Sequence, residues 1–168
     1  MVQLSPDNGL PGWDRISGYF YPDTTIAGFS HTHLSGTGAG DLYDISFMPV
    51  TRPYKEAPAP LGIYSTFSHN DEAASAGYYR VLLKDYNINV ELTATERCGI
   101  QRYTFPEAEA SVFLNLKKAM NWDFTLDSKI EVVDSTTIRG YRLSQGWSPL
   151  QHVYFETRFS KPFVACHM

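Results

Sequence analysis

Apolar and polar side chains alternate along several segments in the second half of the chain. The clearest segment spans residues 87–95, whose apolar members are Ile88, Val90, Leu92 and Ala94. Because neighbouring side chains of an extended strand point to opposite faces, this pattern predicts a strand with one buried face. Further segments rich in β-branched and aromatic residues are also predicted to be strands: 78–84, 110–116, 128–133, 136–143 and 153–159.

Turn-forming residues separate these segments at short intervals. Asp85-Tyr86 and Asp134-Ser135 each stand between two predicted strands, and so short a connection predicts a hairpin turn between antiparallel strands. The first 60 residues hold clusters of glycine and proline, such as Asn8-Gly9-Leu10-Pro11-Gly12. Such clusters interrupt long elements, so this part is predicted to consist of short strands joined by loops.

Helical patterns are nearly absent. Residues 71–76 could form a single helical turn, but no window of about 11 or more residues repeats apolar positions at helical spacing. Closely spaced antiparallel strands predict an all-β fold, an antiparallel β-sandwich whose sheets bury their apolar faces against each other. A length of 168 residues fits one domain with its own core, so residues 1–168 are predicted to be a single domain.

Composition narrows the possible partners. The formal net charge of −4 arises from 18 acidic and 14 basic residues that are dispersed along the chain. A nucleic-acid partner is not expected, because binding phosphates requires a concentrated basic face. A membrane-spanning helix is not expected either, since no apolar run reaches the roughly 18 residues that a span needs.

The cysteines and the start of the chain say little about its compartment. Cys98 and Cys166 are too few for a disulfide framework, and their spacing leaves open whether they pair. The first residues lack a secretory signal, which indicates either a cytosolic protein or a true N-terminus further upstream.

The segment of residues 28–41 is the strongest candidate for a binding site, because it combines two histidines with a glycine-rich run. His31 and His33 are two residues apart, so on an extended chain their rings would share one face. Two such imidazoles could bind a transition metal or donate hydrogen bonds to the hydroxyls of a polar ligand. A zinc site usually needs three or four protein ligands, and no third His or Cys has a suitable spacing. An equally weighted alternative is that both histidines only form hydrogen bonds to the backbone of the loop.

A second candidate is Trp13 with its neighbours Asp14 and Arg15, in a predicted loop. Sugar rings have apolar faces and hydroxyl edges, so their sites typically combine a flat aromatic ring with charged or amide partners. The alternative is that Trp13 closes one end of the sandwich. Other acidic residues are numerous without being distinguished by spacing. The nucleophile elbow, the phosphate-binding loop and the dinucleotide fingerprint are absent, which excludes their chemistries.

These motifs occur together in one order that resembles the N-terminal half of the family 92 glycoside hydrolases. The resemblance covers almost the whole chain and is carried by residues 2–7, 12–13, 17–19, 28–41, 77–79, 91–99 and 103–106. It implies an exo-acting α-mannosidase, usually calcium-dependent and inverting, that trims mannose from N-glycans. In such enzymes a β-sandwich packs on a larger (α/α)6 barrel, and the active site lies between the two.

By the same resemblance, Trp13 and Asp14 are expected to contact the sugar, while His31, His33 and Asp41 shape or line the cleft. The general acid, the general base and most calcium contacts are expected from the barrel, so no catalytic residue or metal ligand is assigned to this chain. Calcium is expected in the intact enzyme and is not expected to bind this part. For the intact bacterial protein, the resemblance implies a periplasmic or extracellular location.

Two departures from the family pattern suggest a chain truncated at both ends. An N-terminal segment rich in Gly and Pro is missing, and no barrel follows residue 168. Such a fragment is expected to be inactive alone and to expose an inter-domain face through which it could self-associate. One alternative is a free-standing carbohydrate-binding module. Another is a small metal-dependent hydrolase using His31 and His33, although the barrel fold of such enzymes needs about 250 residues and alternating helices.

Overall fold

The computed structural model describes residues 1–34, 40–58, 61–106, 109–119 and 123–167. Over these residues the chain forms antiparallel strands and two short 3₁₀ helices, η1 (Trp13–Arg15) and η2 (His69–Asp71). The prediction of an all-β fold is therefore confirmed. Within the described residues, no helix is long and apolar enough to cross a membrane.

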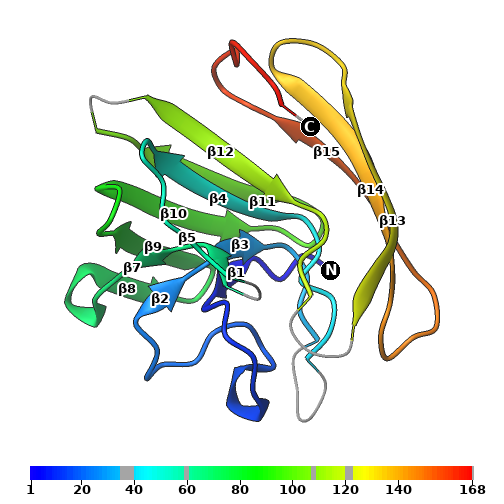
Figure 1. Ribbon diagram of the computed structural model, residues 1–168, viewed down its shortest axis with the longest axis horizontal. Coiled ribbons are helices and arrows are strands. Elements are labelled where there is room, and N and C mark those ends of the chain that lie inside the picture. The colour runs from blue at the N-terminus through cyan, green and yellow to red at the C-terminus, as the bar shows by residue number, and fades with distance from the viewer. Residues whose placement is uncertain (35–39, 59–60, 107–108, 120–122, 168) are drawn as a thin grey trace.

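Three sheets stack in layers (Figure 1). The central sheet contains, in spatial order, β1 (Ser5–Asp7), β3 (Gly28–Ser30), β4 (Ser46–Thr51) and β12 (Ala110–Asn115). The four-stranded meander on one side contains β8 (Glu72–Ser75), β9 (Tyr78–Leu83), β10 (Ile88–Ala94) and β11 (Gly99–Thr104). The three-stranded meander on the other side contains β13 (Phe124–Val132), β14 (Thr137–Gln145) and β15 (Gln151–Arg158). Two short pairs join β2 (Thr25–Ile26) to β7 (Ser65–Thr66) and β5 (Glu56–Ala57) to β6 (Gly62–Ile63).

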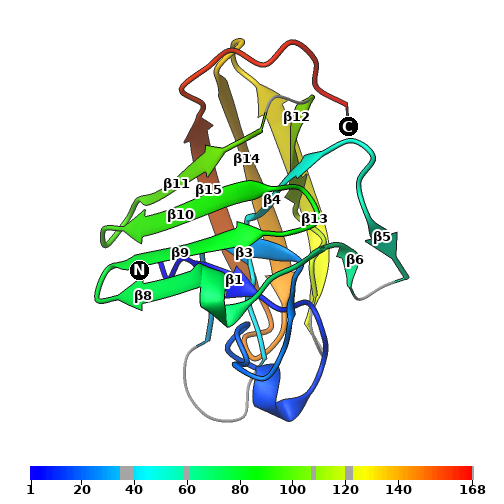
Figure 2. The same cartoon turned by 90° about the vertical axis from the view of Figure 1, so that its left-hand side faces the viewer.

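The larger core lies between the central sheet and the four-stranded meander. β10 supplies Ile88, Val90 and Leu92, which are all buried, while Thr93 and Ala94 at its end are exposed. The predicted alternation is thus confirmed for most of this strand. The smaller core lies on the opposite face of the central sheet, between it and the three-stranded meander. The sandwich therefore has a third layer, whose strands run across those of the four-stranded meander in Figure 2.

β4 is buried along its whole length because each of its faces meets a different core. Met48 and Val50 belong to the larger core, and Phe47 belongs to the smaller one. Proline is rare in central strands, since it cannot donate a ladder hydrogen bond. Pro49 is tolerated because the pairing between β3 and β4 is limited to Phe29 with Phe47, which leaves only β12 beside Pro49.

Most predicted elements in the second half are present with shifted ends. Residues 84–87 connect β9 to β10 and residues 133–136 connect β13 to β14, which confirms both hairpins. β13 begins earlier than predicted and contains a register shift between Thr125 and Asp127. The helical turn predicted for residues 71–76 is wrong: Glu72–Ser75 form β8 because they pair with β9. Cys98 and Cys166 are exposed free thiols.

Candidate functional site

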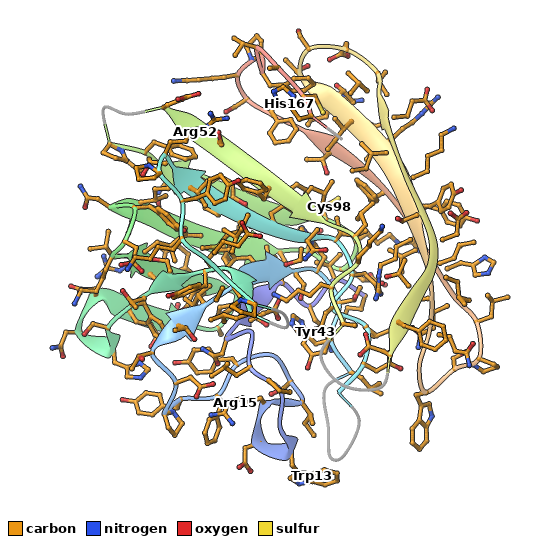
Figure 3. All side chains as sticks on the ribbon, viewed as in Figure 1. Trp13, Arg15, Tyr43, Arg52, Cys98 and His167 are labelled. Atoms are coloured by element: carbon orange, nitrogen blue, oxygen red, sulfur yellow. The ribbon has the colours of Figure 1, made fainter. Side chains whose placement is uncertain are left out.

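The predicted site residues lie mainly on loops at one end of the layers, which we call the loop edge. It comprises residues 8–24 with η1, residues 31–34 and 40–45, and the turn of residues 146–150 between β14 and β15. In both Figure 1 and Figure 2, η1 and the β14–β15 turn lie toward the lower end. Figure 3 shows Trp13 at the outer limit of this edge, while Arg52 and His167 lie at the opposite end of the molecule.

The loop of residues 8–24 presents Trp13 and Asp14 to solvent. The Trp13 side chain is 71% exposed, and Asp14 is exposed beside it. Behind them, the Arg15 guanidinium donates two hydrogen bonds of 2.5 Å to the carboxylate of Asp23. The buried Asn8 amide closes the base of the loop by donating to the Thr25 carbonyl at 2.7 Å. Trp13 is therefore a solvent-facing ring on a braced loop, and it does not close an end of the sandwich.

His33 belongs to the loop edge but lies in a buried ion cluster and is only 6% exposed. Its Nε2 lies 2.7 Å from Asp7 Oδ1, and its Nδ1 lies 2.8 Å from the carbonyl oxygen of Gln3. Because a carboxylate and a carbonyl can only accept, both ring nitrogens donate and His33 is an imidazolium. Lys118 Nζ binds the other carboxylate oxygen of Asp7 at 3.2 Å.

The pKa values in this cluster follow from its charges. Burial alone would lower the pKa of His33, but the charge and hydrogen bond of Asp7 and the Gln3 carbonyl raise that pKa above its ordinary value. Burial would likewise raise the pKa of Asp7, but Lys118 and His33 hold it below its ordinary value. The buried Gly18 backbone is part of the same arrangement, because a Cβ there would lie 2.6 Å from Asp7 Oδ1.

Ser30 brings a hydroxyl to the same cluster, but the geometry is not that of a nucleophilic triad. A catalytic triad places the Ser and the Asp on opposite nitrogens of the imidazole. Here Ser30 Oγ lies 2.9 Å from His33 Nε2, the nitrogen that Asp7 also contacts, and Ser30 is 0% exposed. The cluster therefore holds three segments together and does not present a nucleophile.

His31 has different partners from His33. Its Nδ1 donates to the carbonyl oxygen of Ile45 at 2.7 Å, and its Nε2 lies 3.4 Å from the Gln101 amide nitrogen of β11. Burial lowers the pKa of His31, so the ring is neutral and can accept from Gln101. The two histidines therefore brace different neighbours, His33 toward β1 and His31 toward β11.

Residues 41–45, which we call the bridge segment, connect the parts of the loop edge. Leu42, Tyr43 and Ile45 have φ angles of 82°, 53° and 56°, in the left-handed region that non-glycine residues seldom occupy. Strained backbone of this kind persists only where surrounding contacts fix it. One such contact is the buried Tyr43 hydroxyl, which donates to the Ile16 carbonyl at 2.6 Å and so ties the bridge segment to the η1 loop.

Arg142 of β14 fixes the bridge segment from the three-stranded meander and is only 1% exposed. Its Nη1 donates to the Leu42 carbonyl at 3.0 Å and forms an ion pair with Asp44. Its Nε and Nη2 donate to the carbonyls of Leu116 and Lys118 at 3.0 and 2.9 Å. One side chain thus joins the bridge segment to the segment that follows β12.

Asp41 ties the bridge segment to the β14–β15 turn and is 1% exposed. Its carboxylate accepts from the backbone N–H of Trp147 at 2.6 Å and from the side-chain amide of Gln151 at 2.8 Å. A third bond comes from the N–H of Leu42 at 2.7 Å. Sequence reasoning identified Asp41 but missed Trp147, whose side chain is 72% exposed. A usable signal was the pair Gly146-Trp147, which repeats Gly12-Trp13.

The described residues do not fit a calcium site, which would need about six to eight oxygen ligands. They contain no group of three or more His, Cys, Asp or Glu side chains placed to hold a metal ion. The buried carboxylates of the described residues already have partners: Asp7 has His33 and Lys118, Asp23 has Arg15, Asp44 and Asp123 have Arg142, and Asp41 has N–H donors. The calcium implied by the resemblance stays a prediction for the rest of the intact enzyme.

Two other observations limit the site. Residues 35–39, which hold most of the glycine-rich run that follows His33, lie outside the described residues. A groove of about 1030 Å³ lies between the central sheet and β13, and residues such as Met48, Phe113 and Ile130 line it. None of the five predicted site residues is among its lining residues.

Comparison with known proteins shows the family to which this domain belongs. The family model described as the glycosyl hydrolase family 92 N-terminal domain matches residues 1–168. The chain is therefore a glycoside hydrolase domain, and it belongs to family 92. The expected family and the expected fold are both confirmed. No curated protein matches the chain.

Solved structures agree with this assignment. The family 92 α-mannosidase BT3965 from Bacteroides thetaiotaomicron, solved with mannoimidazole, is 40% identical with a TM-score of 0.90, over 97% of this chain and 22% of that chain. The family 92 glycosyl hydrolase ccman5 is 25% identical with a TM-score of 0.71, over 92% of this chain and 22% of that chain. The inverting mannosidase BT2199 from B. thetaiotaomicron, 19% identical with a TM-score of 0.64 over 96% of this chain and 25% of that chain, shows the shared fold. The chain thus spans about a quarter or less of the structures that it matches.

Proposed function

We propose that this chain is the sugar-binding N-terminal domain of an exo-acting, inverting and calcium-dependent α-mannosidase that acts on N-glycans. The observation that carries the proposal is the family 92 match over residues 1–168, together with 40% identity to an α-mannosidase that was solved with mannoimidazole. In this proposal the domain supplies the loop edge, and an (α/α)6 barrel in the rest of the enzyme closes over it.

The charges of the loop edge support this division of labour. Inverting hydrolysis needs two carboxyl groups about 6.5–9.5 Å apart, with a water molecule between one of them and the sugar. The carboxylates of Asp7, Asp41 and Asp44 are buried and engaged, which makes them unsuited to protonate a leaving group or activate water. We therefore assign the general acid and the general base to the barrel, and sugar contact to the exposed Trp13 and Asp14.

Exposed apolar side chains support a partner on this end of the domain. Phe124 and Leu126 are both 48% exposed, and Leu150 is 55% exposed. An isolated domain would leave these side chains in water, so we propose that it self-associates when the barrel is absent. We also propose, from the resemblance alone, that the intact bacterial enzyme is periplasmic or extracellular.

The proposal is tested by assaying this chain and the full gene product on α-mannosides, with and without a calcium chelator. We expect hydrolysis only by the full gene product and only without chelator, with β-mannose as the first product. Equal activity of the two proteins would contradict the assignment of the acid and base to the barrel. Full activity after chelation would contradict the calcium requirement alone.

The exposure of Trp13 also suits a free-standing carbohydrate-binding module. Titration calorimetry of this chain with mannose and mannobiose separates the two functions. A domain that provides half of a shared cleft binds neither sugar measurably, whereas an autonomous module binds at least one of them with the isolated chain. Trp13→Ala is the control, because it removes a binding signal that depends on the exposed ring.

A further inference from the structure

The β14–β15 turn carries a second exposed tryptophan on the loop edge. Trp147 is 72% exposed, which is close to the 71% of Trp13. Both rings follow a glycine; Trp13 stands on the loop of residues 8–24 and Trp147 on the short turn of residues 146–150. An exposed aromatic side chain lacks the stabilisation that burial would give it. Two of them on one edge therefore indicate a surface that meets a ligand or partner.

The turn that carries Trp147 is fixed from behind by Asp41. The buried carboxylate accepts from the Trp147 N–H at 2.6 Å and from Gln151 at 2.8 Å. Gly146 allows this close approach, because a Cβ there would overlap the Asp41 carboxylate. Since a carboxylate bonded to N–H donors forms stronger hydrogen bonds than a neutral acceptor, the backbone of Trp147 is held firmly.

The same bridge segment holds both tryptophan-bearing loops. Tyr43 binds the carbonyl of Ile16 next to η1, and Asp41, two residues earlier, binds the N–H of Trp147. The relative position of the two loops is therefore set within the folded domain. A site whose contact residues are fixed in advance loses less entropy when it binds.

We infer that Trp147 is a second sugar-contacting residue, which stacks on the sugar next to the terminal mannose, and that Asp41 is the residue that positions it. This inference rests on the proposed function, in which Trp13 contacts the terminal mannose. Of the possible partners, a sugar suits the surroundings of the ring. Gln145 at the end of β14 and Ser148 in the turn flank Gly146-Trp147 in the chain, and their polar side chains can bind the hydroxyls of a sugar ring.

The experiment compares two substrates of the full gene product. One is 4-nitrophenyl α-mannoside, which has a single sugar, and the other is α-linked mannobiose, which has two. Trp147→Ala is expected to raise KM for mannobiose about tenfold and to change KM for the aryl mannoside much less. Trp147→Phe is expected to recover part of the loss, because it keeps a flat ring.

A matched control removes an aromatic ring of similar exposure away from the loop edge. Tyr154 lies within β15 and is 70% exposed. Tyr154→Ala is expected to leave both KM values within about twofold of the wild-type values. Asp41→Asn and Gly146→Ala test positioning, because each disturbs the turn without removing the ring. Both are expected to raise KM for mannobiose more than KM for the aryl mannoside, with kcat changed little.

The outcomes separate the inference from the proposed function. A wild-type enzyme without activity on either α-mannoside would defeat the proposed function and this inference with it. The wild type could be active while Trp147→Ala raises KM for both substrates equally and lowers Tm. That result would mean that the barrel covers Trp147, and it would overturn the inference alone. Unchanged KM for mannobiose in Trp147→Ala would overturn it as well.

Discussion

Replacing Arg142 by methionine removes the guanidinium that joins the three-stranded meander to the bridge segment. Methionine keeps a long apolar side chain but provides no donor. The carboxylate of Asp44 loses its ion-pair partner inside the protein, and the carbonyls of Leu42, Leu116 and Lys118 each lose a donor. Breaking a buried ion pair on one side typically costs about 3–5 kcal/mol, mainly because the remaining charge stays buried without its partner.

That loss is a large fraction of the free energy of unfolding of an ordinary domain, which is about 5–15 kcal/mol. With a urea m-value of about 2–3 kcal/mol/M for a chain of this size, we expect the unfolding midpoint of Arg142→Met to fall by about 1–2.5 M. The measurement is urea unfolding of this chain at neutral pH, followed by far-UV circular dichroism and by tryptophan fluorescence. Coincident transitions by the two probes are needed before midpoints are converted to free energies.

Arg139 provides a matched control on the opposite face of β14. Its ion pair with Glu131 lies in solvent, with side chains 56% and 46% exposed. Arg139→Met is therefore expected to shift the unfolding midpoint far less than Arg142→Met does. Should Arg142→Met fail to give soluble protein, Arg142→Lys is measured instead, and it is expected to destabilise more than Arg139→Met because an ammonium group cannot serve the same fork of acceptors. Equal midpoints for the substitutions at the two positions would refute the reasoning.

Three further predictions concern the ion cluster around His33 and the bridge segment. Because the pKa of His33 is raised in the folded chain, its stabilising contribution is complete below pH 6.5 and is lost as the pH rises above that value. His33→Gln should therefore flatten this part of a urea-midpoint profile against pH. Because the pKa of Asp7 is lowered in the folded chain, the contribution of Asp7 is present above pH 3.8 and is lost as the pH falls below that value. Gly18→Ala should lower the free energy of unfolding by about 2–4 kcal/mol and Gly77→Ala by about 1 kcal/mol. The angle φ is positive at both glycines, but of the two only Gly18 has atoms within 3 Å of the added Cβ. Equal losses of free energy would contradict this. Tyr43→Phe should cost about 1 kcal/mol and speed amide hydrogen exchange in the η1 loop before it affects the sheets.

β9, β10 and β12–β15 could be predicted from sequence, whereas β8, β11 and the first three strands of the central sheet could not. β10 alternates because one face meets the core and the other faces outward, so its pattern is visible in the residues themselves. β4 is buried on both faces, so the sequence Ser-Phe-Met-Pro-Val-Thr shows no alternation and includes a proline. The pattern of a strand reports how many of its faces are buried, and that number depends on the layers packed against it.

The sequence was enough to propose candidate site residues, but not to predict whether each of them is exposed or buried. Trp13 and Asp14 could be proposed from local composition, because an exposed loop needs only its own residues to be recognised. The contacts of His33 and Asp41 depend on Asp7 and Trp147, which are distant from them in sequence. Whether a histidine or an aspartate is exposed or buried in an ion cluster is decided by such distant partners, and no spacing rule reports them.

The separation between apolar cores and buried charges indicates what the charges contribute. The cores lie between the sheets, while the ion pairs of Asp7 and Asp44 lie where the loops meet the ends of the strands. Well-packed apolar residues can replace a buried ion pair without loss of stability, so stability alone does not require charges in these places. Directional hydrogen bonds can fix a loop that has too few apolar contacts to be fixed by packing. The bridge segment leads directly into β4, the strand buried on both faces, and it is joined to β14 through Arg142. The geometry of the loop edge is thereby set by two sheets at once, as a surface requires when it completes a cleft with a second domain.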